Sequence, residues 1–312
     1  MGKKIVATPI LKWAGSKLRL IKQLEEYLPS FETRFEYYIE PFVGGGALLF
    51  WMLNNRSDYF GQAVAYDHNR DLINMYKTVQ KDVESLIEQL ESLQAEIRAA
   101  TDPREYYLER RSEYNCSKTT DVVRRSALLI FLNRTCYNGL YRVNRLGEFN
   151  VPYGKRPNAL ICNAEVLRKD SEDLRCVEFV CGDYSEALAP DGFQDRSFFY
   201  FDPPYRPLSP TSSFDRYTKD VFGERQQIEL AEHCQMLNRQ GAHLMISNAD
   251  TSGTRPNDMF YEEHFPRPPF YHHRVFAPRL VNANPHKRGP IPEILITNYR
   301  PVKLKSVKRK CR

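Results

Sequence analysis

The sequence lacks the features that carry a chain into or across a membrane. No stretch of its 312 residues approaches the roughly 18 consecutive apolar residues that span a bilayer. The opening residues, Met1-Gly2-Lys3-Lys4, lead into only a short apolar run, which is too brief for a secretory signal. We therefore expect a soluble protein of the cytoplasm with no membrane partner.

Cysteine lacks the spacing of a disulfide framework or a zinc site. The chain has seven cysteines, an odd number, and no two of them form a C-x-x-C pair. They are Cys116, Cys136, Cys162, Cys176, Cys181, Cys234 and Cys311. We expect free thiols and no bound metal.

The charge balance excludes little. The formal net charge of +6 suits a polyanionic partner but is shared by many proteins that bind none. Basic residues crowd the tail 301–312, where they would either attract phosphates or keep a disordered end in solution. Both interpretations of the tail stay open.

Six apolar segments predict strands. They cover 37–40, 63–66, 177–181, 197–201, 243–247 and 293–297. Polar residues follow several of them directly, as at Asp67, Asp183 and Asp202. Apolar strands that alternate with helices and end in polar groups are typical of a doubly wound α/β sheet, with a ligand crevice along the carboxyl ends. We therefore expect a Rossmann-like fold.

Helical patterns dominate between 69 and 175. Apolar residues recur at helical spacing near 69–79, 83–99, 104–114 and 122–132. Residues 137–153 are rich in Asn, Gly, Arg and aromatics, which indicates a hairpin with Gly147 at its turn. We interpret 69–175 as an inserted, mostly helical domain, which leaves 1–68 and 176–300 to the sheet. A further helix over 17–28, capped by Ser16, is expected near the start.

A glycine turn, Glu40-Pro41-Phe42-Val43-Gly44-Gly45-Gly46, joins a strand to a helix. Glycines there let the backbone approach a nucleotide-like ligand at the helix amino end, although a turn needed only for packing would look the same. Asp67 ends the next strand, where an acidic side chain accepts hydrogen bonds from ribose hydroxyls in Rossmann-like folds. Its alternative role is to cap the helix that begins near Asn69.

The most specific feature is Asp202-Pro203-Pro204-Tyr205, directly after an apolar strand. Two prolines remove two amide donors and leave stiff carbonyl acceptors beside a carboxylate. Such a turn would hold a planar primary amine between Asp202 and the carbonyl of Pro203, with the Tyr205 ring stacked on the base. The alternative is a proline-stiffened turn with a capping Asp.

Together these elements resemble the Dam-type DNA adenine methyltransferase family, over about residues 9–299. The matching motifs are Lys12-Trp13-Ala14-Gly15-Ser16-Lys17, the 40–46 turn, Asn133-Arg134, Tyr137-Asn138-Gly139-Leu140-Tyr141-Arg142, Gly147-Glu148-Phe149-Asn150-Val151-Pro152-Tyr153-Gly154 and Asp202-Pro203-Pro204-Tyr205. Their order resembles the α group of amino-methyltransferases. The resemblance implies an S-adenosylmethionine-dependent enzyme that methylates adenine N6 in DNA.

The resemblance also implies a set of residues that hold S-adenosylmethionine. They are Trp13, Lys17, Glu40, Pro41, Phe42, Gly44, Gly46, Asp67, Asp183 and Asp202, with Asp183 beside the cofactor's adenine. One departure is Ser16, where the family usually has glycine. If the backbone at Ser16 needs a positive φ, serine would strain it and disturb the local cofactor contact.

A second implied set contacts DNA: Lys12, Asn133, Arg134, Tyr137, Asn138, Leu140, Arg142 and Pro152. Tyr137 would wedge into the duplex and Asn138 would hold the backbone or the orphaned base. Arg142 would read guanine through O6 and N7, although without the resemblance it would pass for a surface salt-bridge partner. The implied partner is double-stranded DNA with a GATC or related GAT-containing site, bound by a monomer or weak dimer at the nucleoid of a bacterial or phage-infected cell.

The expected mechanism is direct methyl transfer to a flipped adenine, with Asp202, Pro203, Pro204 and Tyr205 as catalytic residues. Asp202 would position the amine more than deprotonate it, and neither a metal nor a cysteine nucleophile is needed. The loop 206–222 would close over the base or line the cleft. Two alternatives remain: a methyltransferase for glutamine or RNA amines, which usually has Asn first in the tetrapeptide, and a DNA-binding protein that has lost catalysis.

Overall fold

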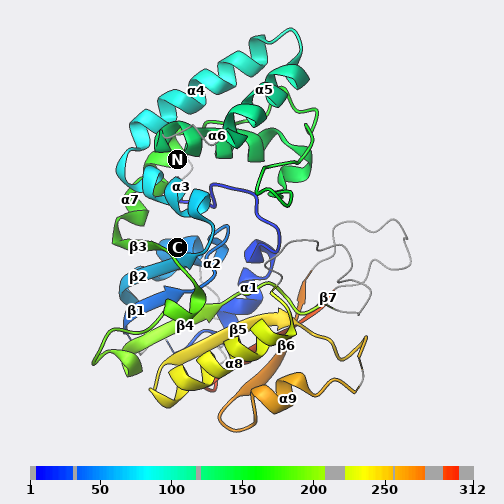
Figure 1. The fold of residues 1–312 in the computed structure, drawn as a ribbon. Coiled ribbons are helices and arrows are strands. Elements are labelled where there is room, and N and C mark those ends of the chain that lie inside the picture. The colour runs from blue at the N-terminus through cyan, green and yellow to red at the C-terminus, as the bar shows by residue number, and fades with distance from the viewer. Residues whose placement is uncertain are drawn as a thin grey trace, which may run out of the picture.

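The computed structural model describes residues 5–30, 34–116, 121–207, 222–255, 257–277 and 291–301. Its centre is a seven-stranded sheet in the spatial order β3, β2, β1, β4, β5, β7, β6 (Figure 1). The strands are β1 (Phe35–Glu40), β2 (Phe60–Asp67), β3 (Val177–Cys181), β4 (Ser197–Phe201), β5 (His243–Ala249), β6 (Tyr271–Ala277) and β7 (Ile291–Thr297). The first five run parallel to one another, and β7 is antiparallel to both β5 and β6.

Helices cover the sheet and extend beyond it. They are α1 (Ile21–Leu24), α2 (Ala47–Arg56), α3 (Arg70–Lys81), α4 (Val83–Ala99), α5 (Pro103–Asn115), α6 (Val122–Thr135), α7 (Ala164–Asp173), α8 (Glu224–Arg239) and α9 (Phe260–His264). Short 3-10 helices are η1 (Lys17–Arg19), η2 (Glu25–Tyr27), η3 (Tyr137–Gly139), η4 (Leu174–Cys176), η5 (Tyr184–Glu186) and η6 (Gln194–Arg196). None of the helices in the described ranges is long and apolar enough to cross a membrane.

Alternating side chains bury both faces of the sheet. Along β4, Phe198 and Tyr200 belong to one apolar cluster, which includes residues of α2 and of α3 to α7. Phe199 and Phe201 belong to a second cluster, which includes residues of α8 and α9. Parallel strands are stable when both of their faces are covered in this way. The expected α/β class with a doubly wound sheet is confirmed.

Helices α3 to α6 pack together above the sheet in Figure 1. The carboxylate of Asp71 on α3 accepts hydrogen bonds from Arg125 on α6, at 2.7 and 2.8 Å. The hydroxyl of Tyr107 on α5 donates to the carbonyl of Val151 at 2.7 Å, which ties the helices to the hairpin. The division of the chain into a catalytic domain and a recognition domain stays a prediction.

The hairpin forms, but without regular strands. Isolated antiparallel bridges pair Cys136 with Tyr153 and Val143 with Phe149. Gly147 occupies its turn with φ +80°, a left-handed conformation that suits glycine. The 137–153 segment is therefore an irregular hairpin, held by isolated bridges and single hydrogen bonds.

Several expectations differ from the structure. The 17–28 segment is broken into η1, α1 and η2, and the Ser16 side chain makes no cap hydrogen bond, so the capped helix was wrong. Strand β6 and helices α7, α8 and α9 were not predicted. Most of the 206–222 loop (208–221) and nearly all of the basic tail (302–312) lie outside the described residues.

Candidate active site

The candidate site lies where the strand order of the sheet reverses. Strands β1 and β4 are parallel neighbours, with Ile39 of β1 opposite Phe199 of β4. The strands that follow β1 in the chain, β2 and β3, lie on one side, and β4 is on the other. Glu40 ends β1 and Asp202 follows β4, so the glycine turn and the Asp-Pro-Pro-Tyr turn leave the same edge from adjacent strands. In open α/β sheets this reversal point is the usual ligand site.

The glycine turn is fixed by Asp67. Gly44 and Gly46 take left-handed backbone conformations, with φ of +47° and +68°. The Asp67 carboxylate accepts hydrogen bonds from the amides of Gly44 at 3.1 Å and Asn69 at 2.9 Å. Asn69, not Asp67, is the N-cap of α3. Asp67 therefore ties the ends of two strands together, and the capping role considered for it is wrong.

Trp13 packs across the glycine turn. A Cβ atom added at Gly45 would lie 2.7 Å from the Trp13 Cβ, and one at Gly44 would lie 3.0 Å from the indole ring. No side chain fits at such distances unless Trp13 moves. Trp13 also stacks with Tyr141, with ring centres 5.1 Å apart. Trp13 thus connects the glycine turn to the hairpin segment.

Lys17 joins the N-terminal segment to the Asp-Pro-Pro-Tyr turn. Its Nζ atom lies 2.9 Å from Oδ1 of Asp202 and donates a hydrogen bond of 2.7 Å to the carbonyl of Gly15. The same ammonium sits 4.5 Å from the centre of the Tyr205 ring. Gly15 takes the positive φ of this segment, +79°, whereas Ser16 has φ −51°. The serine that departs from the family pattern is therefore unstrained.

Glu293 is a site residue that the sequence reasoning missed. Its Oε2 accepts a 2.6 Å hydrogen bond from the hydroxyl of Tyr205. Because β7 runs antiparallel to β5, the beginning of β7 lies at the edge where the parallel strands end. The signal was an acidic residue at the start of a predicted apolar strand, and it points to this edge only once the strand direction is known.

Three carboxyl groups, Glu40, Asp202 and Glu293, lie near one another at this edge, and the ammonium of Lys17 acts on the latter two. Burial raises the pKa of Glu40 to about 8, although its hydrogen bond from Tyr38 works in the opposite direction. Burial likewise raises the pKa of Asp202 and Glu293, and Lys17 opposes both rises. Buried carboxylates in excess over cations favour a positively charged ligand or proton uptake.

Phe42, within the glycine turn, contacts the segment that Asp183 begins after β3. Phe42 stacks on Tyr184 with ring centres 5.3 Å apart. The Asp183 carboxylate caps η5 by accepting hydrogen bonds from the amide and hydroxyl of Ser185 at 2.9 and 2.6 Å. Asp183 therefore has a structural role, whatever else it contacts.

The residues expected to contact DNA fall into buried and exposed groups. Asn133 is fully buried: its Oδ1 accepts from the amide of Lys12, and its Nδ2 donates to the carbonyls of Lys12 and Gly139. Its amide thus fixes Lys12 against the beginning of the hairpin segment. Arg134 is half-buried, and its Nη2 donates to the carbonyl of Ile10 at 2.6 Å.

The exposed group lies along the hairpin. Tyr137 and Leu140 are 55% and 38% exposed, and Asn138 and Pro152 are also exposed. Asn138 has φ +55°, a strained conformation for a residue with a side chain. The Nε of exposed Arg142 donates to Oδ1 of Asn150 at 2.7 Å, and its Nη2 donates to the Asn150 carbonyl at 3.3 Å.

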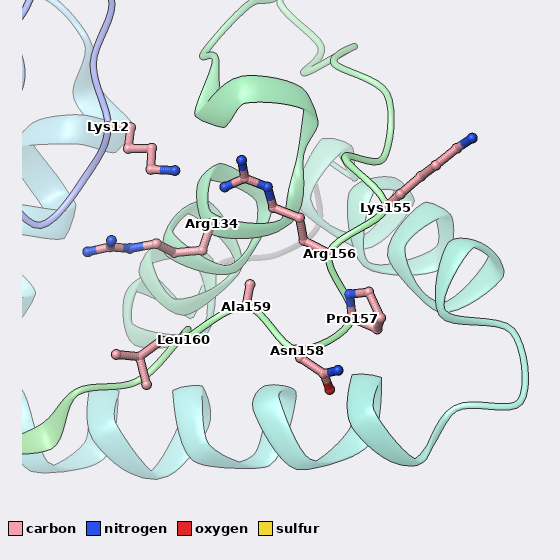
Figure 2. A pocket seen from close by; sticks show the side chains of 8 residues that line it. All are labelled: Lys12, Arg134, Lys155, Arg156, Pro157, Asn158, Ala159 and Leu160. Atoms are coloured by element: carbon pink, nitrogen blue, oxygen red, sulfur yellow. The ribbon is translucent and has the colours of Figure 1, made fainter.

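A basic pocket of about 510 Å³ opens beside this segment (Figure 2). Its lining residues are Lys12, Arg134, Lys155, Arg156, Pro157, Asn158, Ala159 and Leu160, with no acidic residue among them. Lys12 and Arg156 point toward each other, whereas Lys155 extends away (Figure 2). Lys155 and Arg156 were not among the predicted residues, and their signal was the basic pair that follows Gly154. No group of three or more possible metal ligands occurs in the described parts of the chain.

Comparisons with known proteins agree on one family. The model of the D12 class N6 adenine-specific DNA methyltransferases matches residues 13–264. "Type II methyltransferase M.MjaIII" of Methanocaldococcus jannaschii is 43% identical over 93% of this chain and 99% of its own length. "Type II methyltransferase M1.LlaDCHI" of Lactococcus lactis subsp. cremoris is 35% identical, over 95% and 97%. "DNA adenine methylase" of Escherichia coli K12 is 34% identical, over 93% and 95%.

Proposed function

The chain belongs to the D12 class N6 adenine-specific DNA methyltransferases, and from this premise we propose that it takes its methyl group from S-adenosylmethionine and acts on an adenine flipped out of the duplex. The resemblance found in the sequence is confirmed, and the protein is an adenine-specific DNA methyltransferase. This membership excludes the alternative hypothesis of a methyltransferase for glutamine or RNA amines. The observation that carries the proposal is the pairing of the glycine turn with the Asp-Pro-Pro-Tyr turn on adjacent strand ends.

The residues at the strand reversal fit a cationic nucleoside cofactor. Asp67 uses two backbone amides, yet a carboxylate has about four lone-pair sites, so it retains acceptors for ribose hydroxyls. The left-handed Gly44 and Gly46 bring backbone close to a ligand, and the Asp202 carboxylate supplies negative charge. When bound, S-adenosylmethionine supplies a methyl group activated by its sulfonium. We assign its binding to Trp13, Lys17, Glu40, Pro41, Phe42, Gly44, Gly46, Asp67, Asp183 and Asp202.

The target amine is held by acceptors alone. Two N–H groups of adenine N6 match the Asp202 carboxylate and the Pro203 carbonyl, both of which only accept. Even with a raised pKa, Asp202 is too weak a base to ionise a neutral aromatic amine, so it orients the amine. The methylated nitrogen must lose one proton, and burial makes the Asp202 carboxylate a better acceptor for it. Tyr205 would stack on the base with the ring face that Lys17 leaves free.

DNA would contact the hairpin and the basic pocket. Tyr137, Leu140, Arg142 and Pro152 are exposed on one segment, which suits insertion into a groove. The pocket lined by Lys12, Arg134 and Arg156 suits a backbone phosphate. Asn133 would act by fixing Lys12, and Asn138 would hold the backbone or the orphaned base. We propose that 69–175 is the recognition domain and that 1–68 and 176–300 form the catalytic domain.

The proposed target is GATC or a related site that contains GAT, bound by a monomer or weak dimer. The test incubates the protein with labelled S-adenosylmethionine and a duplex library, and then maps the methylated base and its neighbours. Label on adenine N6 within GAT-containing sites is expected. Asp202→Ala should abolish transfer while the protein stays folded by circular dichroism. Methylation at sites without GAT would contradict the target, and activity near the parent's in Asp202→Ala would contradict the mechanism.

A further inference from the structure

Two buried amide side chains lie behind the Asp-Pro-Pro-Tyr turn. Gln227 is on α8 and Asn248 is on β5, and they are only 2% and 3% exposed. Gln227 Nε2 donates a 2.7 Å hydrogen bond to the carbonyl of Pro204. Asn248 Nδ2 donates to Oε1 of Gln227 at 2.9 Å, and its Oδ1 accepts from the amide of Arg206 at 3.1 Å. The two amides thus form a chain from one side of Tyr205 to the other.

The hydrogen bonds fix which way each amide points. The atom of Asn248 that faces the backbone amides of Arg206 and Ala249 must be the oxygen, because those groups only donate. Its nitrogen must then face Gln227, which turns the Gln227 oxygen toward it. The Gln227 nitrogen is therefore left for the Pro204 carbonyl, which only accepts. A fully paired chain of this kind has one orientation.

This chain holds both peptide groups next to Tyr205. Gln227 fixes the carbonyl of the peptide before Tyr205, and Asn248 fixes the amide of the peptide after it. The Pro204 carbonyl is thereby occupied and directed away from any substrate. Among the described residues, none donates a hydrogen bond to the carbonyl of Pro203.

We propose that Gln227 and Asn248 are positioning residues for methyl transfer: they turn the Pro204 carbonyl inward, so that the Pro203 carbonyl is the acceptor presented to the target amine. This inference rests on the proposed function of the turn. Neither side chain touches the substrate, and both act through the backbone around Tyr205. A displacement of the acceptor by about 1 Å lowers a rate up to about a hundredfold.

The first test changes Gln227 in two ways. Gln227→Leu removes both hydrogen bonds at nearly constant size, and it should lower the single-turnover rate constant at saturating DNA and cofactor about tenfold or more. The affinities for cofactor and DNA, measured separately, should stay within about twofold, since the proposed defect is one of alignment. Gln227→Glu can accept from Asn248 and, when protonated, can still donate to Pro204. Its rate relative to the parent should therefore be near one at low pH and fall as the carboxyl ionises.

Gln235→Leu is the matched control. Gln235 lies on the same helix, and its Nε2 donates to the carbonyl of His264 at 2.7 Å, away from the Asp-Pro-Pro-Tyr turn. It should also lose thermal stability, but without a change in single-turnover rate. Asn248→Asp, which keeps the acceptor for Arg206 but loses the donor to Gln227, should resemble Gln227→Leu.

The outcomes separate this inference from the function on which it rests. If the unmodified protein transfers methyl to DNA and Gln227→Leu transfers it at the same rate, the inference alone is overturned. The inference is also overturned if Gln235→Leu loses as much rate as Gln227→Leu and the rate of Gln227→Glu does not depend on pH. That pattern would reflect a general loss of stability. No transfer by the unmodified protein overturns both.

Discussion

Lys17 Nζ lies 2.9 Å from Oδ1 of Asp202, and this cation offsets the carboxyl groups of Asp202 and Glu293. The Lys17 side chain is 5% exposed and that of Asp202 is 21% exposed, so water screens the pair weakly. Removal of one partner of a buried pair leaves the other charge uncompensated. The contact therefore sets the charge state of the carboxylate that orients the amine.

Lys17→Met is expected to shift the acid limb of the pH–activity profile to higher pH. Burial raises the pKa of Asp202 and Glu293, and Lys17 opposes that rise, so its loss raises both values further. A larger fraction of Asp202 is then protonated at neutral pH, and the neutral carboxyl accepts from the amine more weakly and cannot take up its proton. The measurement is the single-turnover rate from pH 5 to 9. Lys22→Met, an exposed lysine on α1, is the control. An unchanged acid limb would show that Lys17 does not set the Asp202 charge.

Glu40→Gln is expected to stabilise the protein more as the pH rises. Burial raises the pKa of Glu40 to about 8 from an ordinary value of 4.5. A group with a raised folded-state pKa contributes stability that is present below pH 4.5 and is lost as pH rises through about 8. Glutamine does not ionise, so the variant does not lose this stability as the pH rises. The free energy of unfolding, measured with urea at several pH values, should favour the variant by a margin that grows between these limits. A margin independent of pH would contradict the raised pKa.

Sequence patterns revealed the parts of the site that are continuous in the chain. The glycine turn and the Asp-Pro-Pro-Tyr turn each carry their own local signal, and the parallel strands before them are apolar runs. Lys17 and Asp67 followed from the family resemblance or from strand-end position. The structure brings all four elements to one edge of the sheet.

The missed residues depend on distant partners. Glu293 reaches Tyr205 only because β7 is antiparallel, and no local pattern gives strand direction. Gln227 stands in a polar run on α8, and its burial follows from helical spacing with Leu230, Ala231 and Cys234. Strand β6 has mostly half-buried or exposed side chains, so it lacks the apolar run that marked the other strands. Ser16 did not cap a helix because the chain there folds as short turns around Lys17.

Tyr137→Ala is expected to impair base flipping without affecting cofactor binding. The ring is 55% exposed on the hairpin segment, so its loss should leave stability nearly unchanged. Stacking of the Tyr137 ring in the space that the flipped base leaves should shift the equilibrium toward the flipped state about tenfold. The measurement is the fluorescence rise of 2-aminopurine at the target position. Phe276→Ala, 48% exposed on β6, is the matched control. An undiminished rise in Tyr137→Ala would exclude the wedge role.

Asn150 is expected to sharpen guanine recognition through Arg142. Oδ1 of Asn150 accepts from Nε of Arg142 at 2.7 Å, and its carbonyl accepts from Nη2 at 3.3 Å, so the guanidinium is oriented before DNA binds. Pre-organisation lowers the entropy lost on binding. Arg142→Ala should reduce discrimination against a substituted guanine about tenfold or more. Asn150→Ala should reduce it less.

The double variant decides whether the two residues act as one unit. If Asn150 works only by orienting Arg142, then Asn150→Ala adds nothing once Arg142 is alanine, and the double variant should discriminate no worse than Arg142→Ala. The rate constants of the parent, the two single variants and the double variant, measured on duplexes that differ at single positions, complete this double-mutant cycle. Lys155→Ala is the contrasting control. Loss of a lysine at the basic pocket should weaken DNA binding equally for all sequences and make that binding less dependent on salt. Additive losses in the double variant would mean that Asn150 contacts the DNA independently of Arg142.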